Sequence, residues 1–218
     1  STLDSVDLCA RLVDGRVIRG ESEIGHSHSR IEQLHLQRTD GLTDQPPKVY
    51  EPALRAILDA DLIVLGPGSL YTSVIPNLLF EDIVKAIRAS TATVVYVCNV
   101  ATQHGETDHF GAADHIREVI KYLGDATISY ALVNNNRAVE EAIEEGVPVE
   151  AVIDEGLDGL QDAVAILARD VVSDANPLRH DPAKLANALY ELATNPEPAR
   201  GWTNPTPVQQ RSLSAAER

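Results

Sequence analysis

The stretch ADLIVLGPGSLYTSVIPNLL (60–79) decides the expected fold, because it places an apolar run, a glycine-rich loop and the start of a helix in succession. The run DLIVL (61–65) is almost entirely apolar, which is typical of a parallel strand covered on both faces. The segment 78–90 has the spacing of an amphipathic helix, with Asn77 as its expected N-cap. A strand, a loop and a helix in this order indicate an α/β fold with a largely parallel sheet.

The same alternation continues on both sides of this stretch. Toward the N-terminus we expect a β-hairpin at 6–20 and a further strand at 31–36. Further helices are expected at 51–60, 112–124 and 182–193, and further strands at 93–100 and 127–135. A weaker pattern predicts a helix at 139–146 and strands at 148–153 and 163–172, the last of these by its length alone. We therefore expect one domain over 1–193 and a polar, Pro-rich tail at 194–218.

Charge and hydropathy exclude several classes of partner. The chain has 18 basic and 33 acidic residues, a formal net charge of −15, and such a surface repels nucleic acid and anionic lipid. No apolar run reaches the length of about 18 residues that a membrane span needs. The N-terminus lacks the pattern of a secretory signal, so a cytoplasmic location is the default. A small phosphorylated ligand remains compatible with this charge, because backbone N–H groups can hold a phosphate without many lysines.

The loop after the first strand has the composition of an anion-binding loop. Gly66 and Gly68 let a ligand approach the backbone, and Ser69, Thr72 and Ser73 offer hydroxyl donors. The loop has no Gly-Lys-Ser/Thr sequence, and it also lacks the third glycine of a dinucleotide-binding loop. An ordinary turn between strand and helix explains the same residues equally well.

Two further loops follow strands and carry hydrogen-bonding side chains. The loop 99–109 is dense in amides and hydroxyls, which can read the hydroxyls of a sugar or a nucleoside. Asn134 begins a run of three asparagines, which either contact a ligand or form a turn. Near the last helix, Arg179 either binds a phosphate through two N–H groups or belongs to a capping cluster with Asp181 as N-cap.

No metal site or catalytic group is predicted from the spacing. The histidines at 104, 109 and 115 and their acidic neighbours do not have the spacing of a zinc site. A Mg²⁺ ion bridged by ligand phosphates and by Glu106 or Asp108 is chemically simpler. Cys98 lies in an apolar strand, where a thiolate is disfavoured, and no Ser-His-Asp arrangement is evident. The catalytic residues are therefore unknown.

Three stretches resemble a known family. They are ADLIVLGPGSLYTSVIPNLL (60–79), VYVCNVATQHGETDHFGAADHI (95–116) and LRHDPAKLANALY (178–190), and VDLCARLVDGRVIRGESEI (6–24) is similar to the hairpin of the same family. The family is that of the bacterial gluconeogenesis factors (YvcK-like), which is related in fold to the 2-phospho-L-lactate transferase (CofD) of coenzyme F420 synthesis. The resemblance spans about 6–192.

The resemblance implies a Rossmann-like, three-layer α/β fold with an appended hairpin. It implies binding of a UDP-sugar, typically UDP-N-acetylglucosamine, and a regulatory role in cell shape during gluconeogenic growth. The transferase branch instead uses Mg²⁺ and a deazaflavin acceptor, and its first loop carries Asn-Pro where this chain has Leu70-Tyr71, which favours the regulatory branch. Carried over by motif, the phosphate side would be lined by Gly66, Gly68, Ser69, Tyr71, Thr72, Ser73 and Asn77. The sugar or nucleoside would face Asn99, Thr102, Gln103, Glu106 and Thr107, and Arg179 would contact the ligand.

The chain departs from the family pattern in two respects. Ala101 and His104 replace the usual Met and Pro, and the N-terminal GGGTG loop has no counterpart, so the chain is expected to be N-terminally truncated and to hold part of a ligand site. Three hypotheses remain: a nucleotide-sugar-binding regulator, a Mg²⁺-dependent phospholactyl or phosphoenolpyruvyl transferase, and a non-catalytic interaction domain. Whether the protein is an enzyme stays open, as does self-association into a homo-oligomer.

Overall fold

The computed structural model describes residues 1–27, 29–41, 45–125, 127–137, 140, 148–160 and 162–194. Its centre is a four-stranded parallel sheet with the strand order β4-β5-β6-β7. The strands are β4 (Leu62–Leu65), β5 (Thr93–Val97), β6 (Tyr130–Asn134) and β7 (Ala165–Arg169). Because the strands follow chain order, each crossover moves one position across the sheet and the strand ends share one edge.

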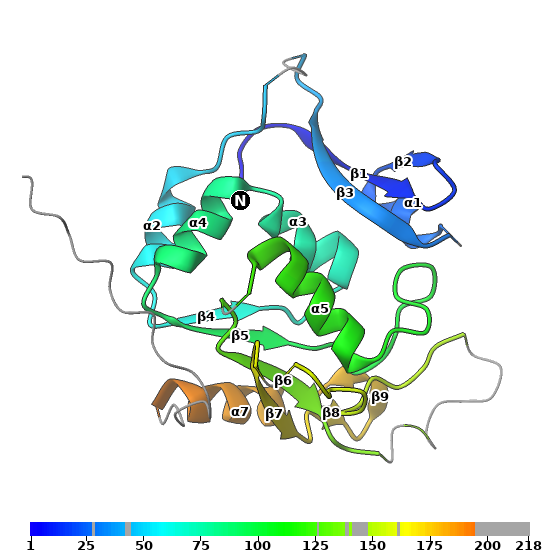
Figure 1. The fold of residues 1–218 in the computed structure, drawn as a ribbon, viewed down its shortest axis with the longest axis vertical. Helices are drawn as coiled ribbons and strands as arrows, with labels where there is room; N and C mark the ends of the chain where they lie inside the picture. Colours follow the sequence, from blue (N-terminus) through cyan, green and yellow to red (C-terminus); the bar gives the residue numbers. More distant parts are fainter. Residues whose placement is uncertain are drawn as a thin grey trace, which may run out of the picture.

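Helices cover both faces of this sheet, as Figure 1 shows. One face carries α2 (Glu51–Leu58), α3 (Ile75–Leu78), α4 (Glu81–Ala89) and α5 (Ala112–Leu123), and the other face carries α7 (Pro182–Thr194). Along β5, Val94 and Tyr96 pack into the core beneath α3, α4 and α5, whereas Val95 and Val97 pack against α7. Since successive strand residues point to opposite faces, both sets had to be apolar. The expected three-layer fold with a parallel sheet is confirmed.

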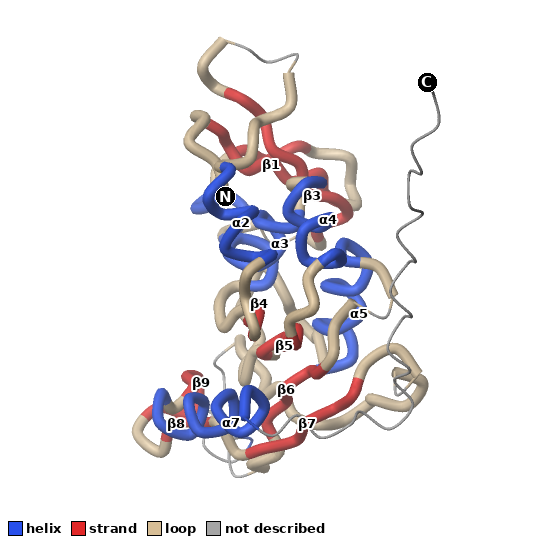
Figure 2. Tube along the Cα trace, turned by 90° about the vertical axis from the view of Figure 1, so that its left-hand side faces the viewer, coloured by secondary structure: helices blue, strands red, loops and turns tan. Residues whose placement is uncertain are grey.

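A second, antiparallel sheet lies on the helices at the far side from the central sheet (Figure 2). Its strands are β1 (Val6–Leu12), β2 (Val17–Arg19) and β3 (Ile31–Arg38), in the order β2-β1-β3. The predicted hairpin is therefore present, but β3 pairs with β1 along its whole length and makes the sheet three-stranded. The short helix α1 (Glu21–Gly25) connects β2 to β3. Leu8, Ala10, Leu12 and Leu34 bury the face toward the helices.

The segment after β4 differs from the prediction. Instead of a loop to residue 77, the chain forms a π-helix, η1 (Leu70–Val74), which continues into α3 before α4 begins at Glu81. Pro76 is compatible with this because it occupies the first turn of α3, where a proline needs no hydrogen-bond donor. The expected N-cap role of Asn77 is wrong: Asn77 lies inside α3, and its Nδ2 donates to the carbonyl oxygen of Ser73 at 2.8 Å.

The C-terminal part has shorter strands than its hydropathy pattern predicts, and it contains an additional hairpin. The strand expected at 148–153 is reduced to one antiparallel bridge between Ala101 and Ala151. The strand expected at 163–172 ends at Arg169, and a hairpin of β8 (Val172–Ser173) and β9 (Asn176–His180) follows. The helix predicted at 139–146 lies outside the described residues except for Glu140, and so does the predicted tail except for Thr194. Within the described ranges, no helix is long and apolar enough to cross a membrane.

Candidate ligand-binding site

A cavity of about 750 Å³ lies at the carboxyl ends of β4 and β5, and the hairpin β8–β9 forms its far wall. Ligands of parallel α/β sheets bind at this edge, because loops from neighbouring strands converge there. The cavity brings together part of the predicted set, namely Gly68, Ser69, Asn99, Thr102, Gln103 and Arg179. It adds lining residues that were not predicted, which are Pro67, Val100, Ala101, His104, Val149, Asn176, Leu178 and His180.

Arg179 is the basic side chain of this cavity. It is exposed on β9 and forms no hydrogen bond or ion pair with any residue that the structure describes. By contrast, the guanidinium of Arg137 contacts the carboxylates of Asp154 and Glu155. Asp181 caps α7 without Arg179, since its Oδ1 accepts hydrogen bonds from the backbone N–H groups of residues 183 and 184 at 2.9 Å each. Arg179 is therefore open to an anionic ligand, and its planar guanidinium suits two oxygens of one phosphate.

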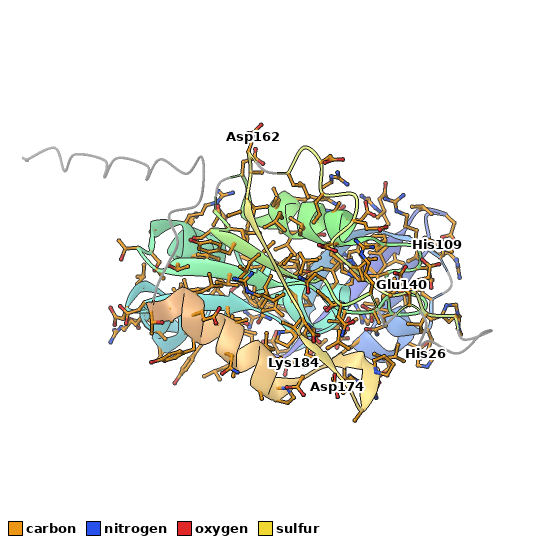
Figure 3. All side chains as sticks on the ribbon, turned by 90° about the horizontal axis from the view of Figure 1, so that it is seen from below. His26, His109, Glu140, Asp162, Asp174 and Lys184 are labelled. Carbon is orange, nitrogen blue, oxygen red and sulfur yellow. The ribbon has the colours of Figure 1, made fainter. Side chains whose placement is uncertain are left out.

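The first turn of α7 and the end of β5 hold the hairpin that carries Arg179. Lys184 Nζ donates to Asp170 Oδ2, to Asp174 Oδ1 and to the carbonyl oxygen of Val172, each at 2.9 Å. Figure 3 labels Lys184 and Asp174, which lie close together beside α7. On the other side, His180 Nε2 lies 3.1 Å from the carbonyl oxygen of Cys98, the residue that follows β5. The hairpin is thus fixed from two sides.

The loop after β4 already binds an anion of the chain itself, the carboxylate of Glu106. Ser69 Oγ donates to Glu106 Oε2, and Thr72 Oγ1 and Gln103 Nε2 donate to Oε1 at 3.2 and 2.6 Å. The residue types that suggested a phosphate loop therefore contact Glu106, which is only 5% exposed.

Burial controls the proton affinity of this carboxylate. Removal from water raises the pKa of Glu106 above its ordinary value, and the hydrogen bonds from Ser69 and Thr72 oppose that rise without cancelling it. The side chains of Ser69, Thr72 and Gln103 around Glu106 explain how a carboxylate tolerates this site. The cluster joins the loop after β4 to the loop after β5, and so it positions the backbone that forms two walls of the cavity.

Gly105 brings the same cluster against the small sheet. Its φ of +84° suits glycine, and a Cβ there would lie 2.8 Å from the carbonyl oxygen of Gly25 and 2.9 Å from that of Ser27. Gly25, at the end of α1, lies over the Glu106 carboxylate. The segment that connects β2 and β3 therefore supports the loop after β5 through close backbone contact.

The remaining predicted residues lie away from the cavity or hold its loops together. Thr102 Oγ1 accepts from the backbone N–H of Glu150, and Thr107 Oγ1 accepts from that of Gln103, both at 2.8 Å. Asn134 is fully buried and closes a turn with Asn136, through its Nδ2 and its Oδ1. Other members line an apolar groove of about 460 Å³ beside β4, namely Gly66, Ser73 and Asn77.

Tyr71 belongs to the core between η1 and α5. It is 2% exposed, and its ring meets Phe110 edge-on with centroids 6.2 Å apart. Burial, followed by the charge of Glu118, raises the pKa of Tyr71, so its hydroxyl stays protonated. The structure gives Tyr71 a place that packs the loop, not one that faces the cavity.

The histidines and acids of the loop after β5 pair with one another. His104 Nδ1 lies 3.0 Å from Asp108 Oδ1, and His109 Nδ1 lies 2.7 Å from Glu150 Oε1. Among the described residues, no group of three or more His, Cys, Asp or Glu side chains is placed to hold a metal ion. Glu106 and Asp108 each accept hydrogen bonds from within the chain at both carboxylate oxygens. The Mg²⁺ contact that the sequence suggested for one of them stays a prediction.

The hairpin residues were the part of the cavity wall that sequence reasoning missed. Asn176 and His180 both lie on β9, whose sequence NPLRH has no apolar run that would predict a strand, although Asp174 and Asn176 are turn formers. Val149 lines the cavity because the backbone N–H of Thr102 donates to the carbonyl oxygen of Glu150, which brings the two segments together. These contacts join residues distant in sequence, which local patterns do not encode.

Comparison with known proteins decides the family. A family model described as 2-phospho-L-lactate transferase CofD matches residues 1–172. The chain belongs to the CofD family. A putative gluconeogenesis factor of Deinococcus radiodurans is 39% identical over 199 residues, which are 90% of this chain and 41% of that protein. The gluconeogenesis factor of Bacillus subtilis is 38% identical over 197 residues, 86% of this chain and 58% of that protein. The resemblance to gluconeogenesis factors is confirmed.

A solved structure supports the fold of this CofD-family chain. The crystal structure of a member of the UPF0052 family from Bacillus halodurans superposes with a TM-score of 0.76 at 35% sequence identity. The superposition covers 87% of this chain and 60% of the chain from Bacillus halodurans. The chain thus spans about 40 to 60% of the length of the relatives named here.

Proposed function

We propose that the cavity beside Arg179 binds a phosphorylated small molecule of the nucleotide-sugar class, with UDP-N-acetylglucosamine as the first candidate. The observation that carries the proposal is the Arg179 guanidinium, which lines the cavity and has no partner among the described residues. Most of the basic side chains in the described part of the chain contact carboxylates, as Arg137 and Lys184 do. Arg179 supplies a bidentate donor at the sheet edge where such ligands bind.

The rest of the cavity fits the non-phosphate part of such a ligand. Its volume of about 750 Å³ lies in the range of small-molecule sites. The carboxamide of Asn99 has no hydrogen-bond partner in the described part of the chain, so it can both donate to and accept from a hydroxyl or a base. Leu178 and Val149 add apolar surface for a ring.

We further propose a regulatory role in cell shape during gluconeogenic growth, with ligand binding as the signal. Its support is the family resemblance and the relatives named gluconeogenesis factor. The transferase description of the family model supports a second candidate, transfer of a phospholactyl or phosphoenolpyruvyl group. The second candidate predicts a phosphodiester product, detectable by mass spectrometry, when the chain is incubated with Mg²⁺, a deazaflavin acceptor and an activated donor.

Isothermal titration calorimetry of the 218-residue chain tests the binding proposal. We expect a micromolar dissociation constant for UDP-N-acetylglucosamine, weaker binding of UDP, and no heat with N-acetylglucosamine, which lacks phosphate. Absence of heat with UDP-N-acetylglucosamine, UDP-glucose and UDP at millimolar concentration contradicts the proposal. Tight binding of N-acetylglucosamine alone contradicts the role given to Arg179.

A further inference from the structure

His180 stands at a junction between the hairpin and the central sheet. It is the last residue of β9, its half-buried side chain lines the Arg179 cavity, and its Nε2 lies 3.1 Å from the carbonyl oxygen of Cys98. Arg179 and Asn99, the two polar side chains on which the proposed function rests, line the same cavity. The imidazole is therefore both a structural contact and part of the ligand-facing wall.

The contact with Cys98 fixes which nitrogen of His180 carries the proton. A carbonyl oxygen only accepts hydrogen bonds, so Nε2 must be the donor. Burial lowers the pKa of His180, against the opposing effect of the Cys98 carbonyl, so the ring is neutral near pH 7. In the neutral ring with hydrogen on Nε2, Nδ1 is an acceptor. Nδ1 has no hydrogen-bond partner within the described residues.

The cavity therefore offers two complementary groups next to one another in the chain. Arg179 can only donate, whereas the Nδ1 of His180 can only accept. The hydroxyl of Ser69, another polar group of the wall, already donates to Glu106 and lies 2.6 Å from Thr72 Oγ1. The side-chain amide of Asn99 can rotate to present either its oxygen or its nitrogen to a ligand, so Asn99 distinguishes donors from acceptors less strictly.

We propose that His180 is a specificity-determining residue of this cavity, whose Nδ1 accepts a hydrogen bond from a hydroxyl or amide N–H of the bound ligand. The proposal rests on the proposed function of the cavity and adds a chemical requirement to it. A ligand must carry a hydrogen-bond donor in addition to its phosphate, as nucleotide sugars do with their ribose and sugar hydroxyls. Inorganic pyrophosphate satisfies Arg179 but lacks such a hydroxyl.

Two substitutions separate the structural contact of His180 from its ligand contact. The amide of Gln reaches the position of Nε2, so His180→Gln retains a donor to Cys98 and loses the acceptor in the cavity. The amide of Asn reaches the position of Nδ1, so His180→Asn retains an acceptor in the cavity and loses the bond to Cys98. A purely structural histidine would favour Gln over Asn in every assay.

We expect His180→Gln to unfold at the wild-type temperature and to bind UDP-N-acetylglucosamine about tenfold more weakly, with unchanged affinity for pyrophosphate. We expect His180→Asn to lose less affinity for UDP-N-acetylglucosamine than His180→Gln, although it is less stable. Calorimetry with both probes and thermal unfolding measure these quantities.

Wild-type affinity for UDP-N-acetylglucosamine in a stable His180→Gln variant overturns the proposal and leaves the proposed function standing. An equal loss of pyrophosphate binding in that variant also overturns it, because His180 would then act by placing Arg179. If the wild-type chain binds pyrophosphate but no UDP-sugar or UDP, the nucleotide-sugar function fails, and the proposal fails with it.

Discussion

Replacement of Glu106 by Ala is expected to destabilise the protein by about 2–3 kcal/mol. The substitution removes the acceptor of the side chains of Ser69, Thr72 and Gln103. A hydrogen bond to a charged group contributes about 1.5–3 kcal/mol. The sum is reduced for three reasons. Thr72 Oγ1 lies 2.6 Å from Ser69 Oγ and can donate its one hydrogen there, the exposed Gln103 can turn to water, and the desolvation cost of the carboxylate disappears.

Urea and thermal unfolding followed by circular dichroism measure this loss. For a domain of this size, 2–3 kcal/mol lowers the unfolding temperature by about 4–12 °C. The matched control is Glu32→Ala, which removes an exposed ion pair with Arg11 and should cost less than about 1 kcal/mol. Equal stability of the two variants would refute the conclusion that Glu106 links the loops after β4 and β5.

Three further predictions concern the same framework. Gly105→Ala should lower the free energy of unfolding by more than about 2 kcal/mol, because the new Cβ would press on two carbonyl oxygens. The control Gly15→Ala has a similar φ and nothing within 4 Å, so it should cost about 1–2 kcal/mol. Similar unfolding temperatures of the two variants would contradict this expectation. The pKa of Glu106 in the folded protein is raised above its ordinary value of 4.5, so the stability that its protonation contributes is fully present below pH 4.5 and is lost as pH rises through the folded pKa. The pH dependence of urea unfolding that comes from Glu106 should therefore vanish in Glu106→Gln. An identical pH dependence in the wild type and in this variant would contradict the raised pKa. Lys184→Met should speed amide hydrogen exchange in β8 and β9 by releasing the hairpin, whereas Lys85→Met, which breaks an exposed helical ion pair, should leave exchange there as it is.

The sequence could predict those helices and strands in which the local order of apolar and polar residues indicates which side chains are buried. The apolar runs at 61–65 and 93–97 become β4 and β5. β5 is covered on both faces, whereas β4 is an edge strand of the sheet and its Val64 is 36% exposed, so the expected cover on both faces is wrong for β4. The amphipathic spacing at 112–124 likewise becomes α5, with Gly124 at its C-terminal end. Such patterns need no knowledge of distant partners.

The parts that could not be predicted depend on contacts between distant segments. Ser69 and Glu106 are 37 positions apart, and only the folded chain shows that they satisfy each other. The hydroxyl-rich loop was correctly singled out as suited to an anion, but the anion that it contacts is an internal carboxylate. The orientation of His180 similarly depends on Cys98, 82 positions away.

The affinity of the Arg179→Gln variant for UDP-N-acetylglucosamine shows whether this cavity holds the phosphate of the ligand. Gln keeps the length and polarity of the side chain in part but removes the charge and the bidentate geometry, so the dissociation constant should rise at least tenfold by calorimetry. Arg55→Gln on α2 is the matched control, because Arg55 lies on the surface, pairs with Glu51 and lines none of the cavities described above; it should bind like the wild type. An Arg179→Gln variant that binds UDP-N-acetylglucosamine as tightly as Arg55→Gln would contradict the assignment of this cavity as the phosphate site.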